Sequence, residues 1–318
     1  MVGMWWRLGG LGLLAILSVA ALAACGDGPD SGATATAGKT DRTVVLASSD
    51  FAVGKQRLTF VVLNGSVPLT DAPTYVRFFR KADTRSAQLV GGAAIPWVPI
   101  GAEEAAHGGP AHEETGLTGI YYVNIEFDEA GVWGLGVTVG DKLDIETEIR
   151  VQFTVKQKSE APAIGEKAIA VTNATERDKP LRQIHTGSDA DPRFHSLTVA
   201  DAITSGKPSV IVFATPSFCR TRTCGPSLQV AIRAEEKYGD RTNFIHIEPY
   251  ELDDSGNLVN DDKGNSFKPA KEGTAWRLPT EPWVFVVDKA GRVTARFDGP
   301  YAFEELDYSL SQLAAQGG

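Results

Sequence analysis

Clusters of basic residues are missing from this sequence. The chain has 31 lysines and arginines against 40 aspartates and glutamates, and its formal net charge at pH 7 is −9. No stretch gathers lysine and arginine into a block. Because a nucleic-acid-binding domain needs a basic face to meet the phosphate backbone, this composition excludes nucleic acid as an expected partner.

Long apolar runs are also scarce, because residues 8–24 form the only one that could be considered for a membrane. A basic start, M-V-G-M-W-W-R, precedes the run, and small residues end it just before Cys25. This order is typical of a secretion signal, and the run is short for a spanning helix of about 20 residues. We therefore expect residues 1–24 to be a signal peptide.

The end of that run, L-A-A-C at residues 22–25, resembles the lipobox of bacterial lipoproteins. The resemblance implies that Cys25 carries lipid and becomes the new N-terminus, which would anchor the chain to the cell membrane on its extracytoplasmic side. An ordinary signal peptide and a membrane anchor that contains a cysteine are the alternatives. Residues 25–42 are small and polar, as in a flexible tether.

Cysteine is scarce, and this limits the sulfur chemistry that the chain can perform. Besides Cys25 there are two, Cys219 and Cys224, in the stretch F-C-R-T-R-T-C-G-P. If Cys25 carries lipid, each of the two has only the other as a partner within the chain. Outside the cytoplasm such a close pair can be oxidised.

Strand patterns dominate residues 43–157. Residues 57–63 end at an Asn-Gly turn. Residues 121–127 alternate between apolar and polar side chains, and every second residue from 145 to 155 is apolar or β-branched. Short strands with almost no helical pattern predict an all-β sandwich domain. The stretch F-D-E-A-G-V-W-G-L-G-V resembles a hairpin of bacterial envelope immunoglobulin-like domains, which implies an Ig-like architecture.

Histidine occurs five times, so few metal sites based on imidazole are expected. His107 and His112 lie in a Gly-rich stretch before two glutamates, where a metal site competes with a solvated loop. We favour the loop, because no third ligand is fixed nearby. His246 lies within a buried strand pattern and reads as a core residue, and His185 and His195 precede the regular elements.

Beyond a linker at residues 158–180, the pattern changes to alternating helices and strands. Buried strands are expected at 208–213 and 243–248, with a helix at 228–238 between them. A hairpin is expected at 283–297, followed by a closing amphipathic helix at 303–315.

Three local motifs in residues 181–318 resemble the thioredoxin fold. They are V-F-A-T-P at 212–216, T-E-P-W-V at 280–284, where that family has a cis-proline, and the hairpin D-K-A-G at 288–291. The resemblance implies an α/β thioredoxin-like domain of the envelope thioredoxin or peroxiredoxin kind. It also implies that Pro282 would position an extended substrate segment.

The cysteine pair would lie at a helix start in such a domain. Gly225-Pro226 suits the first helical turn, and helix N–H groups lower the pKa of a nearby thiol. Arg220 and Arg222 would add positive charge. Residues five apart on a regular helix are about 7.5 Å apart along its axis, whereas a disulfide needs Cα atoms within roughly 7 Å. Residues 219–224 must therefore form a loop or unwind on oxidation.

Two registers compete for the role of attacking cysteine. Measured from the end of the preceding strand, Cys219 takes the attacking position and Cys224 resolves. Measured from Gly-Pro, C-G-P-S at 224–227 mimics the C-G-P-C of thioredoxin, with serine in place of its second cysteine. We favour the first register.

These observations predict a membrane-anchored thiol–disulfide oxidoreductase of the bacterial envelope that acts on protein thiols and disulfides. No organic cofactor and no metal are implied. A permanent structural disulfide is one alternative. A copper protein of the Sco type, with two close cysteines and a distant histidine, is another, although that family has C-x3-C. The third is a peroxiredoxin-like peroxidase, whose T-P-G-C-x4-C differs from T-P-S-F-C-x4-C here by one residue.

Overall fold

The computed structural model describes residues 34–36, 41–100, 117–188, 190–219, 223–264 and 266–316, which lie in one compact unit, Ser31–Gly318. The expected signal peptide, Cys25, His107, His112, Arg220 and Arg222 lie outside the described residues. Within these ranges no helix has the length and apolar character needed to cross a membrane.

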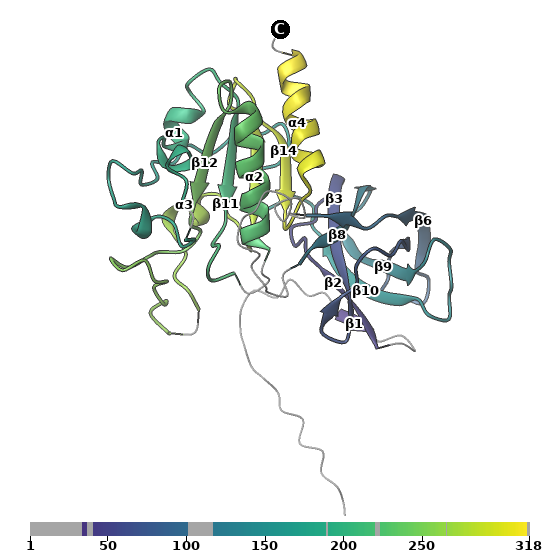
Figure 1. Ribbon diagram of the computed structural model, residues 1–318. Coiled ribbons are helices and arrows are strands. Elements are labelled where there is room, and N and C mark those ends of the chain that lie inside the picture. The colour runs from purple at the N-terminus through teal and green to yellow at the C-terminus, as the bar shows by residue number, and fades with distance from the viewer. Residues whose placement is uncertain are drawn as a thin grey trace, which may run out of the picture. The chain divides into compact units, whose positions relative to one another are not determined.

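The first half of the described chain forms two antiparallel sheets (Figure 1). One has the order β1-β10-β9-β5-β6 and the other β2-β3-β8-β7, with β4 paired to β3. The bounds are β1 Thr34–Thr36, β2 Arg42–Leu46, β3 Gly54–Asn64, β4 Val67–Pro68, β5 Thr74–Arg80, β6 Gln88–Ile95, β7 Val98–Pro99, β8 Gly119–Phe127, β9 Gly131–Val139 and β10 Ile149–Val155.

Alternation of apolar residues explains how these two sheets pack. In β10 every second residue from Ile149 to Val155 is buried, as expected for a strand with one face toward a core. Leu58 of β3 and Leu135 of β9 belong to the same buried cluster, although they come from different sheets. The sheets therefore share one core. The strands expected at 57–63 and 121–127 are confirmed, whereas the strand expected at 145–155 begins only at Ile149.

The second half contains a mixed four-stranded sheet of order β12-β11-β13-β14. Only β11 and β12 are parallel. The bounds are α1 Val199–Ala202, β11 Ser209–Phe213, α2 Cys224–Tyr238, β12 Asn243–Ile247, α3 Lys271–Ala275, β13 Trp283–Val287, β14 Val293–Asp298 and α4 Phe303–Gln316. Short 3-10 helices lie at Leu181–Gln183 and Pro192–His195.

Strands β11 and β13 are buried along their whole length, because both faces of this sheet are covered. Val210 and Val212 point to a cluster shared with α2 and α4. Ile211 and Phe213 point to a second cluster on the opposite face, which includes Trp276. The segment after β11 thus starts from a strand that is fixed on all sides.

The predicted fold class is wrong. The residues that the structure describes are predominantly β, with 36% strand, 17% helix and four α-helices, and they form three antiparallel or mixed sheets and not an α/β thioredoxin-like fold. The proposed membership of that family, with an Ig-like domain before it, is wrong with it. Motifs of a few residues specify local elements such as β11 and α2, whereas fold class depends on long-range strand pairing.

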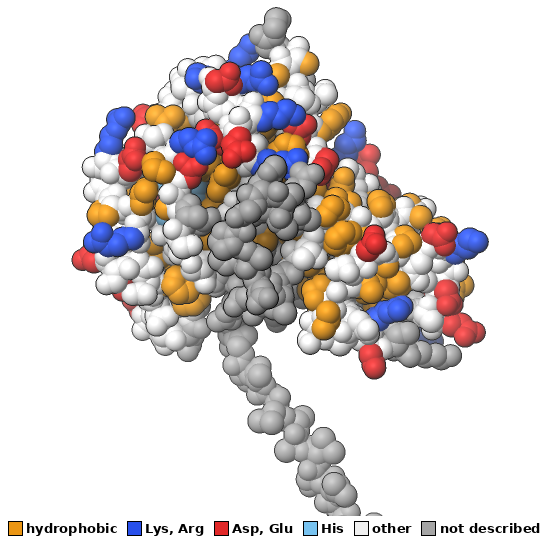
Figure 2. All heavy atoms as spheres, in the orientation of Figure 1, with side chains coloured by type: hydrophobic (Ala, Val, Ile, Leu, Met, Phe, Trp, Pro, Cys, Tyr) orange, Lys and Arg blue, Asp and Glu red, His pale blue; other side chains and the backbone are white. Residues whose placement is uncertain are grey.

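The segment expected to be a linker, residues 158–180, is packed in part against the second sheet. Ala161 and Ala168 belong to the cluster beneath β11. The Ala168 N–H donates to the Gly291 carbonyl at 2.9 Å. Acidic and basic side chains are intermingled on the described face drawn in Figure 2.

A buried carboxylate, Asp298 at the end of β14, fixes the loop before β3. It accepts hydrogen bonds from the Ser49 N–H at 2.6 Å and the Asp50 N–H at 2.8 Å. Burial raises the pKa of Asp298 to about 6, although these N–H groups oppose the shift. Arg57 of β3 and Glu305 of α4 form an ion pair at 2.6 Å nearby.

The buried Asp298 predicts a specific pH dependence of stability. The folded protein holds this proton more tightly than the unfolded chain, whose pKa is near 3.8, so the contribution of Asp298 to stability should decrease as pH rises from about 4 to about 6. In Asp298→Asn this contribution is absent. The free energy of unfolding of the variant relative to wild type should therefore rise by about 3 kcal/mol between pH 4 and pH 7.

Urea denaturation across that pH range measures the effect. Asp254→Asn, at an exposed aspartate, is the control and should track wild type. Parallel stability curves for wild type and Asp298→Asn would contradict the prediction.

Candidate functional site

The two cysteines lie on either side of the start of α2. Cys219 follows a turn in which its N–H donates to the Thr215 carbonyl at 3.1 Å, and it is outside any helix. Cys224 is the first residue of α2, after Thr223 as N-cap. The expectation that the pair cannot lie on one continuous helix is confirmed. The helix N-terminus falls at Cys224 and not at Cys219.

The two sulfurs are close enough to react with each other after a small movement. The Sγ atoms of Cys219 and Cys224 and a carboxylate oxygen of Glu281 all lie within 4.8 Å of one another. Neither cysteine is in a disulfide. Cys219 is 9% exposed and Cys224 is 0% exposed. Both cysteines are therefore buried, and Cys219 keeps the greater exposure.

Burial dominates the chemistry of Cys224. Burial raises the pKa of the Cys224 thiol well above its usual value, and its interaction with Cys219 raises it further. The Thr215 N–H opposes this shift only in part, and Glu281 adds to it. Burial can shift a pKa by 3–5 units, whereas the helix terminus contributes about 0.3–1 kcal/mol. A low pKa from the helix start is therefore not found at the cysteine that occupies it.

Acidic and phenolic groups surround the pair. The Tyr250 hydroxyl donates to Glu281 Oε2, and burial together with Glu281 raises the pKa of Tyr250. Burial also raises the pKa of Glu248, at the end of β12, to about 7. Glu248 Oε1 accepts a hydrogen bond from the Thr186 N–H at 2.7 Å.

Pro282 lies directly after Glu281, and the peptide bond between them is cis. Its carbonyl accepts a hydrogen bond from the Gly299 N–H at 2.9 Å, so this acceptor is already used inside the protein. Trp276 and Trp283 belong to the buried cluster on one face of this sheet, and the two cysteines belong to the cluster on the opposite face.

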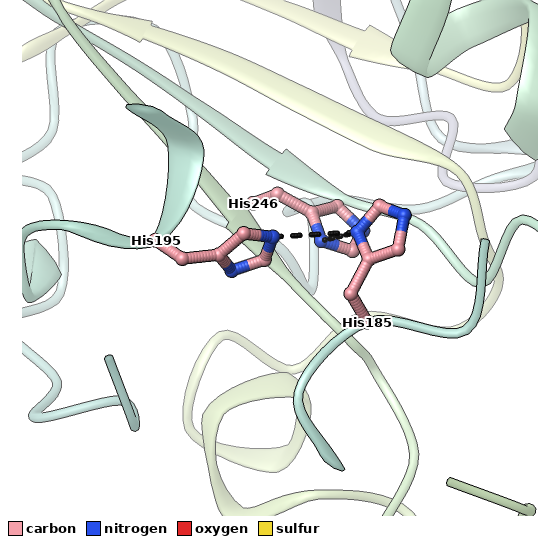
Figure 3. Close-up of side chains that lie close together, drawn as sticks. All are labelled: His185, His195 and His246. Carbon is pink, nitrogen blue, oxygen red and sulfur yellow. Dashed lines mark hydrogen bonds between the residues drawn. The ribbon is translucent and has the colours of Figure 1, made fainter. Parts of the chain in front are cut away.

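Three histidines that the sequence assigned no role come together in the same half of the protein (Figure 3). His185 and His195 come from the segment of short 3-10 helices, and His246 comes from β12. The Nδ1 atoms of His185 and His246 are 3.3 Å apart, as are His195 Nε2 and His185 Nδ1. All three side chains are buried.

Their distance along the chain hides this cluster from a sequence motif search. The one available signal is the parity of β12, because His246 shares the strand face of the buried Phe244. A polar ring at a core-facing strand position needs a polar partner. That argument identifies His246 as a residue with an unseen partner, but does not identify His185 or His195.

No family model matches this chain, and no curated protein or solved structure matches it either. Its function has to be inferred from the geometry of its own residues.

The burial difference predicts unequal reactivity of the two thiols. Iodoacetamide added to the reduced, folded protein near neutral pH should modify Cys219 at least about tenfold faster than Cys224, because the buried thiol is both inaccessible and held protonated. Mass spectrometry of the peptides from each site measures the ratio. In denaturant the ratio should approach one. Faster modification of Cys224 in the folded state would contradict the assignment.

Proposed function

We propose that this protein is a thiol–disulfide oxidoreductase of the cell envelope that acts on protein thiols and disulfides through Cys219 and Cys224. The observation that carries the proposal is the proximity of two sulfurs, both without a disulfide, that lie within 4.8 Å of each other. An exchange reaction needs one sulfur that a client can reach and a second that can reach the first. Cys219 is the less buried of the two residues and is therefore the candidate for the first role.

The reaction begins with the Cys219 thiolate attacking one sulfur of a client disulfide. A Cys219–client mixed disulfide forms, and the other client sulfur leaves as a thiolate that takes up a proton. Cys224 then loses its proton and attacks Cys219 Sγ. The Cys219–Cys224 disulfide forms and the second client thiol leaves, so the client is reduced by two electrons and the pair is oxidised. The reverse sequence oxidises a client dithiol.

Glu281 lies where its carboxylate can accept the proton that Cys224 loses. Its carboxylate oxygen lies within 4.8 Å of both sulfurs, and the Tyr250 hydroxyl donates to that carboxylate and orients it. Because the buried Cys224 holds its proton tightly, the resolving step requires a base at this position. Glu281 can accept the proton as Cys224 attacks.

An apolar side chain that a polypeptide client could contact lies next to Cys219. Phe218 precedes the attacking cysteine and is 38% exposed, although it is a large apolar ring. An exposed aromatic side chain beside a reactive residue offers a contact for an apolar segment of a partner. This supports protein thiols as substrates. Lipid on Cys25 would place the reaction at the outer surface of the membrane.

Copper handling through the cysteines is less well supported. Cu(I) is favoured by thiolates and imidazole, but among the described residues the group around Cys219 and Cys224 is completed by a carboxylate. The three clustered histidines form a separate group. Peroxide reduction would require the Thr215 hydroxyl to hydrogen-bond the peroxide. That hydroxyl lies 3.5 Å from the Thr186 hydroxyl and also hydrogen-bonds Glu248.

The two cysteines should behave differently when each is replaced. Cys224→Ser should accumulate a mixed disulfide with a disulfide-containing client such as insulin, because nothing resolves it. Cys219→Ser should form none and should lose insulin reduction. Non-reducing gel electrophoresis and mass spectrometry identify the linked cysteine, and Ser255→Ala, at an exposed serine, is the control with wild-type behaviour.

Three outcomes would overturn the proposal. One is insulin reduction by Cys219→Ser at the wild-type rate. Another is a Cys219–Cys224 disulfide that resists both glutathione and a dithiol donor, as a structural bridge would. The third is oxidation of Cys219 by hydrogen peroxide far faster than that of an ordinary thiol, or tight binding of one Cu(I) that requires the cysteines, in a protein without exchange activity.

A further inference from the structure

We propose that His185, His195 and His246 form a binding site for a divalent transition-metal ion of the zinc class. Three ring nitrogens converge there: Nδ1 of His185, Nε2 of His195 and Nδ1 of His246 (Figure 3). All three lie within 4.8 Å of one another. The site does not involve the cysteines, so it does not depend on the proposed exchange activity.

Hydrogen bonding alone does not account for this arrangement. His246 Nε2 lies 2.9 Å from the Ala214 carbonyl, which can only accept, so this nitrogen carries the ring hydrogen and Nδ1 of His246 presents a lone pair. His185 Nδ1 faces that lone pair and His195 Nε2, each at 3.3 Å.

One nitrogen cannot make two full hydrogen bonds to its two neighbours. If His185 Nδ1 carries a hydrogen, that hydrogen is shared between two acceptors. If it does not, two lone pairs face each other across 3.3 Å. A cation between the rings accepts all three lone pairs at once.

The spacing of the nitrogens matches that of metal ligands. Two imidazole nitrogens bound to Zn²⁺ at about 2.0–2.1 Å with tetrahedral angles lie about 3.3–3.4 Å apart. Two of the three nitrogen pairs here are separated by 3.3 Å. The side chains therefore need little movement to take the positions of three tetrahedral ligands.

The surroundings of the rings also suit a metal. Ligating histidines usually donate their other ring N–H to an acceptor that fixes the ring. The Ala214 carbonyl does this for His246.

Three protein ligands leave a fourth position for water or another small ligand. A cavity of about 330 Å³ reaches His246 and is also lined by Lys179, Glu248 and Tyr250.

The position of the site suggests that the metal is structural. β12 is an edge strand of its sheet, and the 3-10 helix Pro192–His195 lies against it. In the described parts of this segment, 181–188 and 190–195, the helices are short 3-10 turns. An ion bound to His185, His195 and His246 would join this irregular segment to the sheet. Through the Ala214 carbonyl, it would also fix the strand end that leads to the Thr215 turn.

The test measures metal binding by the whole protein after treatment with a chelator. Titration with Zn²⁺ should show one tight equivalent and a higher melting temperature. Co²⁺ should give the visible absorption of a four-coordinate site without a thiolate charge-transfer band. His195→Ala and His185→Ala should each weaken Zn²⁺ binding by more than about 100-fold, since loss of a direct ligand exceeds the effect of losing a supporting contact.

Two matched controls separate this site from the other metal-ligating residues of the chain. The double variant Cys219→Ser/Cys224→Ser removes both thiols, and the double variant His107→Ala/His112→Ala removes the only other histidines. Both should bind Zn²⁺ as wild type does. Failure of the wild-type protein to bind Zn²⁺ or Co²⁺ would overturn the proposal, as would loss of binding in either control. This holds even if His195→Ala fails to fold.

Discussion

The positions of Cys219 and His246 depend on the burial of β11 at the centre of the second sheet. This strand pairs with β12 on one side and β13 on the other, and all five of its residues are buried. It therefore cannot move without disrupting two strand pairings and two core clusters. Because β11 is fixed, Ala214 and Thr215 at its end are fixed too. The Ala214 carbonyl accepts a hydrogen bond from His246, and the Thr215 carbonyl accepts one from the Cys219 N–H.

Burial makes the two cysteines chemically unequal. Both cysteines belong to the same buried cluster, but only Cys219 retains contact with solvent. Cys224 occupies the helix start, where the backbone favours a thiolate, and burial still keeps it protonated. The effect of a helix terminus thus depends on how much water remains at it. In the proposed exchange reaction, this difference would make Cys219 the attacking thiol and Cys224 the resolving thiol.

Individual elements around the site follow closely from the sequence. The apolar, β-branched run that became β11 and the Gly-Pro of α2 both give strong local signals. The fold class was not predictable in the same way. The motifs that resembled thioredoxin extend over a few residues each, whereas the class depends on sheets such as β1-β10-β9-β5-β6, whose strands pair across more than a hundred residues.

The order of residues is enough to show that a disulfide between Cys219 and Cys224 is incompatible with one continuous helix, and that each has only the other as a partner within the chain if Cys25 carries lipid. Those conclusions follow from composition and covalent geometry, which are local. Only the tertiary structure decided which sulfur is buried, that Glu281 joins them, and that three distant histidines meet. These are properties of packing, because desolvation and side-chain contact arise only when segments far apart in the chain are brought together.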